Sequence, residues 1–240
     1  MFTRSNRILT LALSIIIVTL ALTGAAFFQE TAESEAGSPF TEKFSNDFWD
    51  RWESNVLIGN PNGNYLNLGR KRLMFTLPQT EAHVIVTTSD ASYEDVKVEA
   101  TFENIRSNEA SYAVLCRYSE DGWYEFRISV AGPEAGSYKL MKFDPYLKNQ
   151  FKNPYVVLHP GMDRFFTNDI KLGLNMRNTL ALICKADEFQ IFINDKQQTP
   201  TKNGSFTDNY FTEGSVGYSV QTYGKGLSDI DVTKFSVEAP

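Results

Sequence analysis

Short strand-forming runs, separated by turn-forming residues, fill this chain from Phe40 onward and limit the folds open to it. The runs are rich in Val, Ile, Tyr, Phe and Thr, and Gly, Asn, Asp and Pro stand between them. No stretch of more than about ten residues repeats with a helical period. The pattern predicts an all-β sandwich or barrel over residues 40–240. Its strands are expected in AHVIVTTS, YEDVKVEATF, SYAVLCRY, WYEFRISV, SYKLMKF, NTLALICKADEFQIFIN, SVGYSVQTY and DVTKFSV.

Residues 1–28 are expected to direct export. Arg4 and Arg7 precede an uncharged apolar run, and positive charge at this place keeps the N-terminus in the cytoplasm. A helix of roughly 19 residues spans about 28 Å, which favours an uncleaved signal-anchor transmembrane helix. The Thr-Gly-Ala triplet at residues 23–25 favours a cleaved signal peptide instead. Both alternatives predict an extracytoplasmic domain, either anchored in the membrane by the N-terminal hydrophobic helix or secreted.

The next segment is expected to be a linker, and the overall charge limits the classes of binding partner. Residues 29–39 are acidic and contain Gly and Pro, so a flexible linker is expected there. The chain has a formal charge of −6 and no basic stripe, which argues against a nucleic-acid partner. His83 and His159 are far apart in sequence and are expected to be ordinary loop or edge residues.

SYAVLCRY and WYEFRISV are predicted to form a hairpin around a five-residue loop, residues 119–123. In this register one face is wholly apolar, because register follows the hydrophobic pattern. Its facing pairs are Tyr118–Tyr124, Cys116–Phe126 and Val114–Ile128. The other face pairs Arg117 with Glu125 and Leu115 with Arg127.

The two cysteines, Cys116 and Cys184, each alternate with inward-facing apolar residues. Outside the cytoplasm such a pair often oxidises, so a disulfide is expected. Two separate buried thiols are the alternative.

Four segments carry a family resemblance: PFTEKFSNDF, LCRYSEDGWYEFRIS, NDIKLGLNMRNTLALICKADEFQIFIND and EGSVGYSVQTYGKGLSDIDVTKFSV. In this order they resemble the concanavalin A-like lectin/glucanase jelly rolls, including laminin-G-like domains. The resemblance implies a two-sheet antiparallel jelly-roll sandwich, with one convex and one concave sheet. It also implies that the first strand, near Phe44, pairs with the last, near Phe235. Members of the superfamily bind glycans, hydrolyse them or serve as adhesion modules, so the fold alone does not set the function.

A sugar site combines an aromatic ring with planar hydrogen-bonding groups. Arg117, Trp123, Glu125 and Arg127 fall on one predicted face, and Tyr138 of the next strand is expected to join them. The alternative is a cross-strand ion pair on a solvated sheet with a tryptophan at its rim.

Catalytic and metal-binding signatures are weak. Retaining glycosidases need two carboxyl groups about 5 Å apart. The candidate acid pairs, Glu99 with Glu103 and Asp229 with Asp231, are expected on solvated strand faces instead. No cofactor is expected, although Asp229, Asp231 and Asp144 are weak calcium candidates without the dense spacing of a calcium loop.

Together these features favour a non-catalytic, extracytoplasmic jelly-roll module that binds a carbohydrate or another surface polymer. A structural or protein-interaction domain at the cell surface is the alternative. A glycoside hydrolase with an unrecognised site is the third hypothesis.

Overall fold

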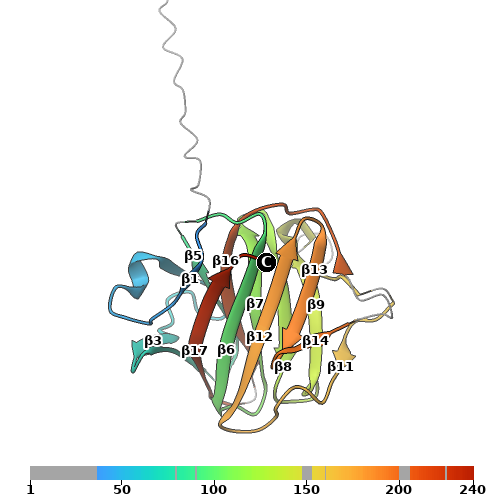
Figure 1. Ribbon diagram of the computed structural model, residues 1–240. Helices are drawn as coiled ribbons and strands as arrows, with labels where there is room; N and C mark the ends of the chain where they lie inside the picture. Colours follow the sequence, from blue (N-terminus) through green and yellow to red (C-terminus); the bar gives the residue numbers. More distant parts are fainter. Residues whose placement is uncertain are drawn as a thin grey trace, which may run out of the picture. The chain divides into compact units, whose positions relative to one another are not determined.

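Two antiparallel sheets form the part of the chain that the structure describes (Figure 1). This computed structural model describes residues 37–78, 80–89, 91–147, 153–159, 161–199, 206–224 and 226–240. The predicted export signal, residues 1–28, lies outside the described residues. Within the described ranges, no helix has the length and apolar character needed to cross a membrane.

Nine strands make up the first sheet, which contains the last strand of the chain. Its order is β14 (Lys196–Gln198), β13 (Glu188–Ile193), β12 (Met176–Lys185), β6 (Val96–Arg106), β17 (Ser228–Glu238), β4 (Arg72–Leu77) and β3 (Leu66–Gly69). In addition, β1 (Phe40–Thr41) pairs with β17, and β15 (Phe206–Thr207) pairs with β13. The predicted pairing of the first strand with the last is therefore confirmed, at Phe40 and Thr41 rather than at Phe44.

Eight strands make up the second sheet, which carries most of the candidate residues. Its order is β10 (Tyr155–Val157), β9 (Ser137–Phe143), β8 (Gly122–Ser129), β7 (Ala110–Ser119), β16 (Ser215–Tyr223), β5 (Glu81–Thr88) and β2 (Trp52–Ile58). The short β11 (Phe165–Phe166) pairs with β9. In Figure 1 β6, β12 and β13 of the first sheet lie in front of β7, β8 and β9 of the second.

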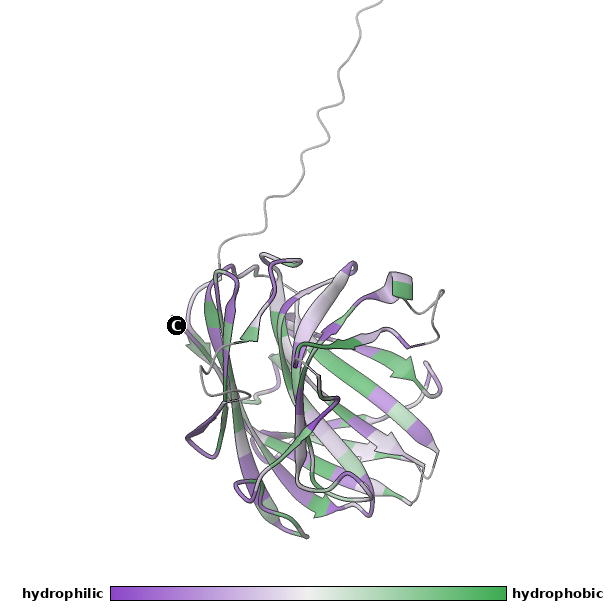
Figure 2. Cartoon of the chain, turned by 90° about the vertical axis from the view of Figure 1, so that its right-hand side faces the viewer, coloured by the Kyte–Doolittle hydropathy of each residue, from purple (hydrophilic) through white to green (hydrophobic). Residues whose placement is uncertain are grey.

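Alternation along the strands builds the core between the sheets. In β12, Leu180, Leu182 and Cys184 are fully buried, whereas Ile183 and Lys185 on the other side are not. Figure 2 shows hydrophobic and hydrophilic segments alternating along the strands. Because successive side chains point to opposite faces, one face of each strand reaches the core, as the sequence predicts.

A disulfide joins Cys116 of β7 to Cys184 of β12 and so links the two sheets. Both sulfurs are buried in the core, and the two Cα atoms are 6.8 Å apart. The predicted bond is confirmed. Disulfides of this kind are characteristic of oxidising, extracytoplasmic compartments.

The predicted register of the β7–β8 hairpin is wrong by two residues. Val114 faces Phe126 and Cys116 faces Tyr124, after which a bulge leads to the pair Ser119–Gly122. A shift of two residues preserves the parity of the pairs, so Val114, Cys116 and Phe126 face the core as predicted although their partners differ. Tyr118 lies beyond the bulge and packs against Trp123 on the other face, so its predicted pairing with Tyr124 is wrong. The bulge arises at Arg117, which adopts a left-handed conformation with φ 52°.

Candidate functional site

Three of the five predicted sugar-binding residues lie together on the outer face of the eight-stranded sheet. The Trp123 indole donates a hydrogen bond to Glu125 Oε2 at 3.2 Å. Arg127 Nε donates to Glu125 Oε1 at 2.6 Å. All three side chains alternate with the core-facing Tyr124 and Phe126 of β8, which places them on the far side of the sheet from the core.

Arg127 is at the centre of this network. Its Nη1 donates to Gln221 Oε1 at 2.5 Å and its Nη2 to the Tyr155 hydroxyl at 3.1 Å. Burial by itself lowers the pKa of Arg127, but the interactions with Glu125, Tyr155 and Tyr223 together outweigh burial and raise the pKa above its ordinary value. The guanidinium therefore stays charged, and its charge is balanced by a carboxylate that is itself fully buried.

His83 of β5 lies beside the same network. Its Nδ1 is 3.5 Å from the Tyr155 hydroxyl, and its ring faces the Tyr155 ring. Burial, together with the charge of Arg127, lowers the pKa of His83 well below its ordinary value, so the imidazole is neutral at pH 7. The expectation that the histidines are loop or edge residues is wrong for His83, which lies within β5 between two other strands. His159 does lie in a loop, after β10, although its side chain is buried.

A pocket of about 310 Å³ contains this network in its wall. Its lining residues are Leu57, Ile58, His83, Arg127, Phe143, Asn153, Pro154, Tyr155 and Gln221. Apolar walls with a few convergent polar groups are typical of ligand sites, which usually measure roughly 300 to 1,000 Å³. We call this pocket the Arg127 pocket.

The aromatic ring that the Arg127 pocket presents is Tyr155, not Trp123. Trp123 is only 3% exposed, because its ring stacks on Phe143 at 3.8 Å and also touches Tyr118. Tyr155 is half-buried, with the Arg127 guanidinium 4.9 Å from its ring centre. Trp123 therefore packs against neighbouring side chains on the outer face of the sheet, while Tyr155 lines the pocket.

Arg117 does not share a face with Glu125, and that prediction is wrong. The bulge turns its side chain into the protein, where it is 1% exposed. Its guanidinium donates to three main-chain carbonyls, those of Glu94, Ala186 and Phe211. These contacts hold three connecting segments together, which is a structural role.

Tyr138 also lies apart from the other candidates. It faces Ile128 across the β8–β9 ladder and belongs to the core, where its ring stacks on Phe165. The prediction that it joins Trp123, Glu125 and Arg127 is wrong, because its position in β9 has the parity of the core-facing residues. Lys139, one residue later, is the residue that faces Arg127.

The weak calcium candidates of β17 are each engaged with an arginine. Asp229 lies 2.6 Å from Arg106, and Asp231 lies 2.6 Å from Arg72. Among the described residues, no group of three or more His, Cys, Asp or Glu side chains is placed to hold a metal ion. Asp144 accepts a hydrogen bond from the Tyr146 main chain.

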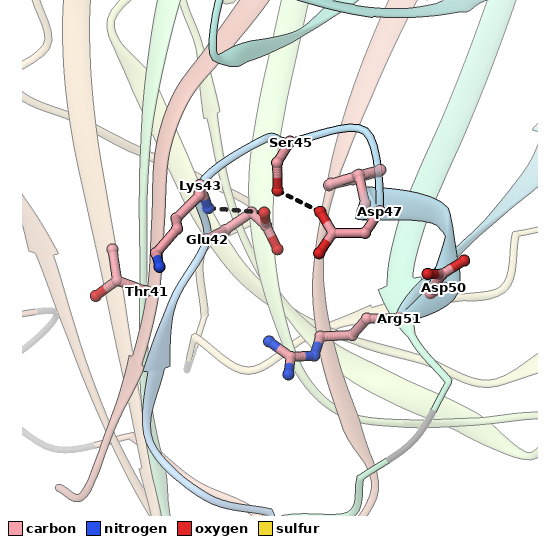
Figure 3. A pocket seen from close by; sticks show the side chains of 8 residues that line it. Thr41, Glu42, Lys43, Ser45, Asp47, Asp50 and Arg51 are labelled. Carbon is pink, nitrogen blue, oxygen red and sulfur yellow. Dashed lines mark hydrogen bonds between the residues drawn. The ribbon is translucent and has the colours of Figure 1, made fainter.

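A second hollow, of about 420 Å³, lies beside the short 3-10 helix η1 (Phe48–Asp50) (Figure 3). The charged side chains that line it form hydrogen bonds within the surrounding segment. Glu42 accepts hydrogen bonds from the Lys43 and Phe44 main chains and from the Trp52 indole. Figure 3 shows Ser45 hydrogen-bonded to Asp47 in the same turn. These hydrogen bonds stabilise the segment that connects β1 to β2.

Sequence reasoning missed His83, Gln221 and Tyr155. Alternation in AHVIVTTS and SVGYSVQTY carries a signal for the first two, since it sets His83 and Gln221 opposite to the core-facing valines. The pairing of β16 with both β5 and β7 then brings them beside Arg127. That pairing joins strands distant in sequence, and no local pattern specifies it.

Known proteins resemble this chain in structure, whereas the sequence comparisons found no match. No protein-family model matches the chain, and no curated protein matches it. Among solved structures, the carbohydrate-binding module CBM66 from Bacillus subtilis matches with a TM-score of 0.51 and 16% identity, over 75% of this chain and 94% of that one. The Bacillus licheniformis β-glucanase matches with a TM-score of 0.58 and 11% identity, over 85% and 99%.

The carbohydrate recognition domain of Emp46p, in its potassium-bound form, is similar as well, with a TM-score of 0.54 and 11% identity over 79% of this chain and 88% of that one. Identities this low are evidence for the fold and not for a shared activity. The two sheets, their order and these likenesses agree with one another. The chain has the concanavalin A-like lectin/glucanase jelly-roll fold.

Proposed function

We propose that this protein is a non-catalytic, extracytoplasmic module that binds a carbohydrate chain in the Arg127 pocket. The observation that carries the proposal is the composition of that pocket. Arg127 and Gln221 supply planar hydrogen-bonding groups, and the half-buried Tyr155 supplies an aromatic ring. Sugars present hydroxyl groups to the first kind of side chain and C–H faces to the second.

The structural neighbours support a carbohydrate ligand. One is described as a carbohydrate-binding module and one as a carbohydrate recognition domain. Another, LamA from Zobellia galactanivorans, was solved in complex with laminaritriose and laminaritetraose. Since identity to these proteins is low, the likeness supports the class of ligand and not a particular sugar.

The acidic residues favour binding over hydrolysis. Glycosidases use two carboxyl groups, about 5 Å apart when they retain configuration and roughly 6.5 to 9.5 Å apart when they invert it. None of the described residues that line the Arg127 pocket is Asp or Glu. Glu125, which lies behind Arg127, is fully buried and already paired.

We propose that the domain is either anchored in the membrane by residues 1–28 or secreted, with residues 29–39 as a linker and residues 40–240 as the sandwich. The disulfide supports an extracytoplasmic location. Detection of the full-length chain in the membrane fraction, or of a shortened chain in the medium, separates the two forms.

A glycan array tests the binding proposal. The full-length chain is purified in a detergent without a sugar headgroup and screened with and without calcium. We expect competable binding to a carbohydrate, and we expect Tyr155→Ala and Gln221→Ala each to weaken it about tenfold, because each removes one pocket contact worth about 1.4 kcal/mol. Asn153→Ala, at an exposed position of the lining, gives a second variant. It removes the hydrogen bond that Asn153 Oδ1 accepts from the Tyr155 main-chain N–H, so weaker binding is expected here as well.

Tyr210→Ala is the matched control, since Tyr210 is an exposed aromatic residue outside the Arg127 pocket. It should bind as the unmodified protein does. A blank array in both conditions contradicts the proposal and favours the protein-interaction alternative. Turnover of a polysaccharide that is lost on changing one acidic residue contradicts the non-catalytic part.

A further inference from the structure

Trp49 is exposed where the other two tryptophans of the chain are buried. Its side chain is 44% exposed, against 2% for Trp52 and 3% for Trp123. A tryptophan in this state leaves part of a large, flat apolar ring accessible to a ligand that can stack on it.

The ring of Trp49 is also held in place. It comes from η1, whose neighbouring residue Phe48 is 2% exposed and stacks on Trp52 at 5.4 Å with an interplanar angle of 6°. Trp49 itself lies edge-on against Phe48, with ring centres 4.8 Å apart. A ring fixed in this way loses little conformational freedom when a ligand stacks on it.

Trp49 forms one wall of a cleft of about 440 Å³ at the open edge of the sandwich. The cleft joins β2 and β3, which are the terminal strands of the two sheets. Its lining residues are Trp49, Ser54, Asn55, Val56, Pro61, Gly63, Asn64, Tyr65, Leu66 and Val84. We call it the edge cleft.

The loop that closes the edge cleft is ordered by its own hydrogen bonds. The Tyr65 hydroxyl accepts the Asn60 main-chain N–H at 2.8 Å, and Gly63 donates to the Asn60 carbonyl. Gly63 lies so close to Tyr65 that an added Cβ would come within 2.4 Å of its ring. The part of the lining that this loop supplies is therefore preformed, which lowers the cost of binding.

The polar groups of the edge cleft indicate the class of ligand. Ser54, Asn55 and Asn64 are exposed hydrogen-bonding side chains, and no described residue of the lining is charged. An anionic ligand finds no cation there, whereas a neutral sugar finds amide and hydroxyl partners beside a flat ring.

We propose that the edge cleft is a second carbohydrate-binding site, specific for an uncharged sugar that stacks on Trp49. The site is distinct from the Arg127 pocket, yet both are lined by β2: Val56 lines the cleft, and the next two residues, Leu57 and Ile58, line the pocket. The proposal rests on Trp49 and its surroundings and does not depend on ligand binding at Arg127.

Acrylamide quenching of tryptophan fluorescence tests the proposal, because Trp49 is the accessible indole. The full-length chain is titrated with neutral gluco-, xylo-, manno- and fructo-oligosaccharides and with an alginate oligosaccharide as the charged probe. We expect at least one neutral sugar, but not the alginate, to reduce the quenchable fraction. The Trp49 variants lack this indole, so their binding is measured by isothermal titration calorimetry. Trp49→Ala should weaken binding of that sugar about fivefold to tenfold, and Trp49→Phe about twofold, because a smaller ring remains.

A Tyr155→Ala variant separates the two sites, since its edge cleft is unchanged. Protection of Trp49 that persists in this variant supports an independent site. Protection that disappears there overturns it, as does a failure of every neutral sugar to protect Trp49. Phe166→Ala, an exposed aromatic residue on β11, is the matched control and should leave both readouts unchanged.

Discussion

The outer faces of the two sheets both carry pairs of acidic and basic side chains, but the two pairs differ in their exposure to water. On the nine-stranded sheet, Glu99 pairs with Lys234 at 2.7 Å, and the two side chains are 16% and 51% exposed. On the eight-stranded sheet, Glu125 pairs with Arg127 at 2.5 Å, and the two side chains are 0% and 10% exposed. Water screens the first pair and is excluded from the second.

This difference agrees with the proposal that the eight-stranded sheet carries the binding site. A solvated ion pair adds little to stability and gives no fixed geometry. A buried pair is costly to desolvate and is tolerated where further hydrogen bonds hold it, as Trp123, Gln221 and Tyr155 do here. The eight-stranded sheet thus holds a buried polar network under the Arg127 pocket, while the Glu99–Lys234 pair of the nine-stranded sheet is in contact with water.

The largest effect is expected from breaking the buried pair. Glu125→Ala leaves the Arg127 charge buried without its carboxylate and should lower the free energy of unfolding by about 3 to 5 kcal/mol. Glu99→Ala, in the exposed pair, should lower it by less than about 1 kcal/mol. Urea denaturation of both variants measures the contrast, and equal losses would contradict the distinction between the two faces.

A smaller effect is expected from removing the bond between the sheets. Cys116 and Cys184 are 68 positions apart, so their disulfide closes a long loop in the unfolded chain. Replacing both by Ala should lower the free energy of unfolding by about 2 to 4 kcal/mol. Denaturation of the double variant tests this, with the unmodified protein under reducing conditions as a second measurement. If neither change alters the denaturation midpoint, the bond does not stabilise the sandwich.

The smallest effect concerns pH. Burial lowers the pKa of His159 to about 4, from an ordinary value of 6.5. The folded protein therefore binds fewer protons than the unfolded chain between these values, and stability falls as the pH falls through this window. His159 Nε2 accepts the Leu140 main-chain N–H, a bond that the protonated ring cannot accept.

Between pH 6.5 and 5 the contribution of His159 should be about 1.5 kcal/mol, because each pH unit corresponds to about 1.4 kcal/mol and the unfolded histidine is already half-protonated at pH 6.5. His159→Gln should flatten the stability profile by this amount without reversing it, because His83 is also buried in its neutral form. Thermal or urea unfolding at several pH values gives the comparison. A variant with the same slope as the unmodified protein would show that His159 does not titrate in this range.

Local alternation made much of the fold predictable. The inward positions of Leu180, Leu182 and Cys184 follow from the period of two, and so does the apolar face of the β7–β8 hairpin. The register of that hairpin was not predictable, because a bulge at a left-handed Arg117 replaces the open loop that the hydrophobic pattern favours. An arginine in this conformation has no signature in the sequence.

The candidate site was predictable from the sequence only for residues that lie on the same strand. Trp123, Glu125 and Arg127 lie on one strand, so their common face could be read from alternation. His83 and Tyr155 come from β5 and β10, and their places depend on strand pairings between distant segments. The exposure of Trp49 depends on which side of a three-residue helix faces the core, and sequence spacing does not specify it.

The pairing of β1 with β17 places the entrance and the exit of the sandwich side by side. Phe40 lies opposite Val237, and Thr41 lies opposite Ser236. A domain whose two ends meet in this way can be inserted into a surface loop of a host protein, or have its ends joined and reopened elsewhere, without unfolding its sheets. This jelly roll is therefore suited to insertion into another protein as an intact domain, with both junctions at the β1–β17 pair.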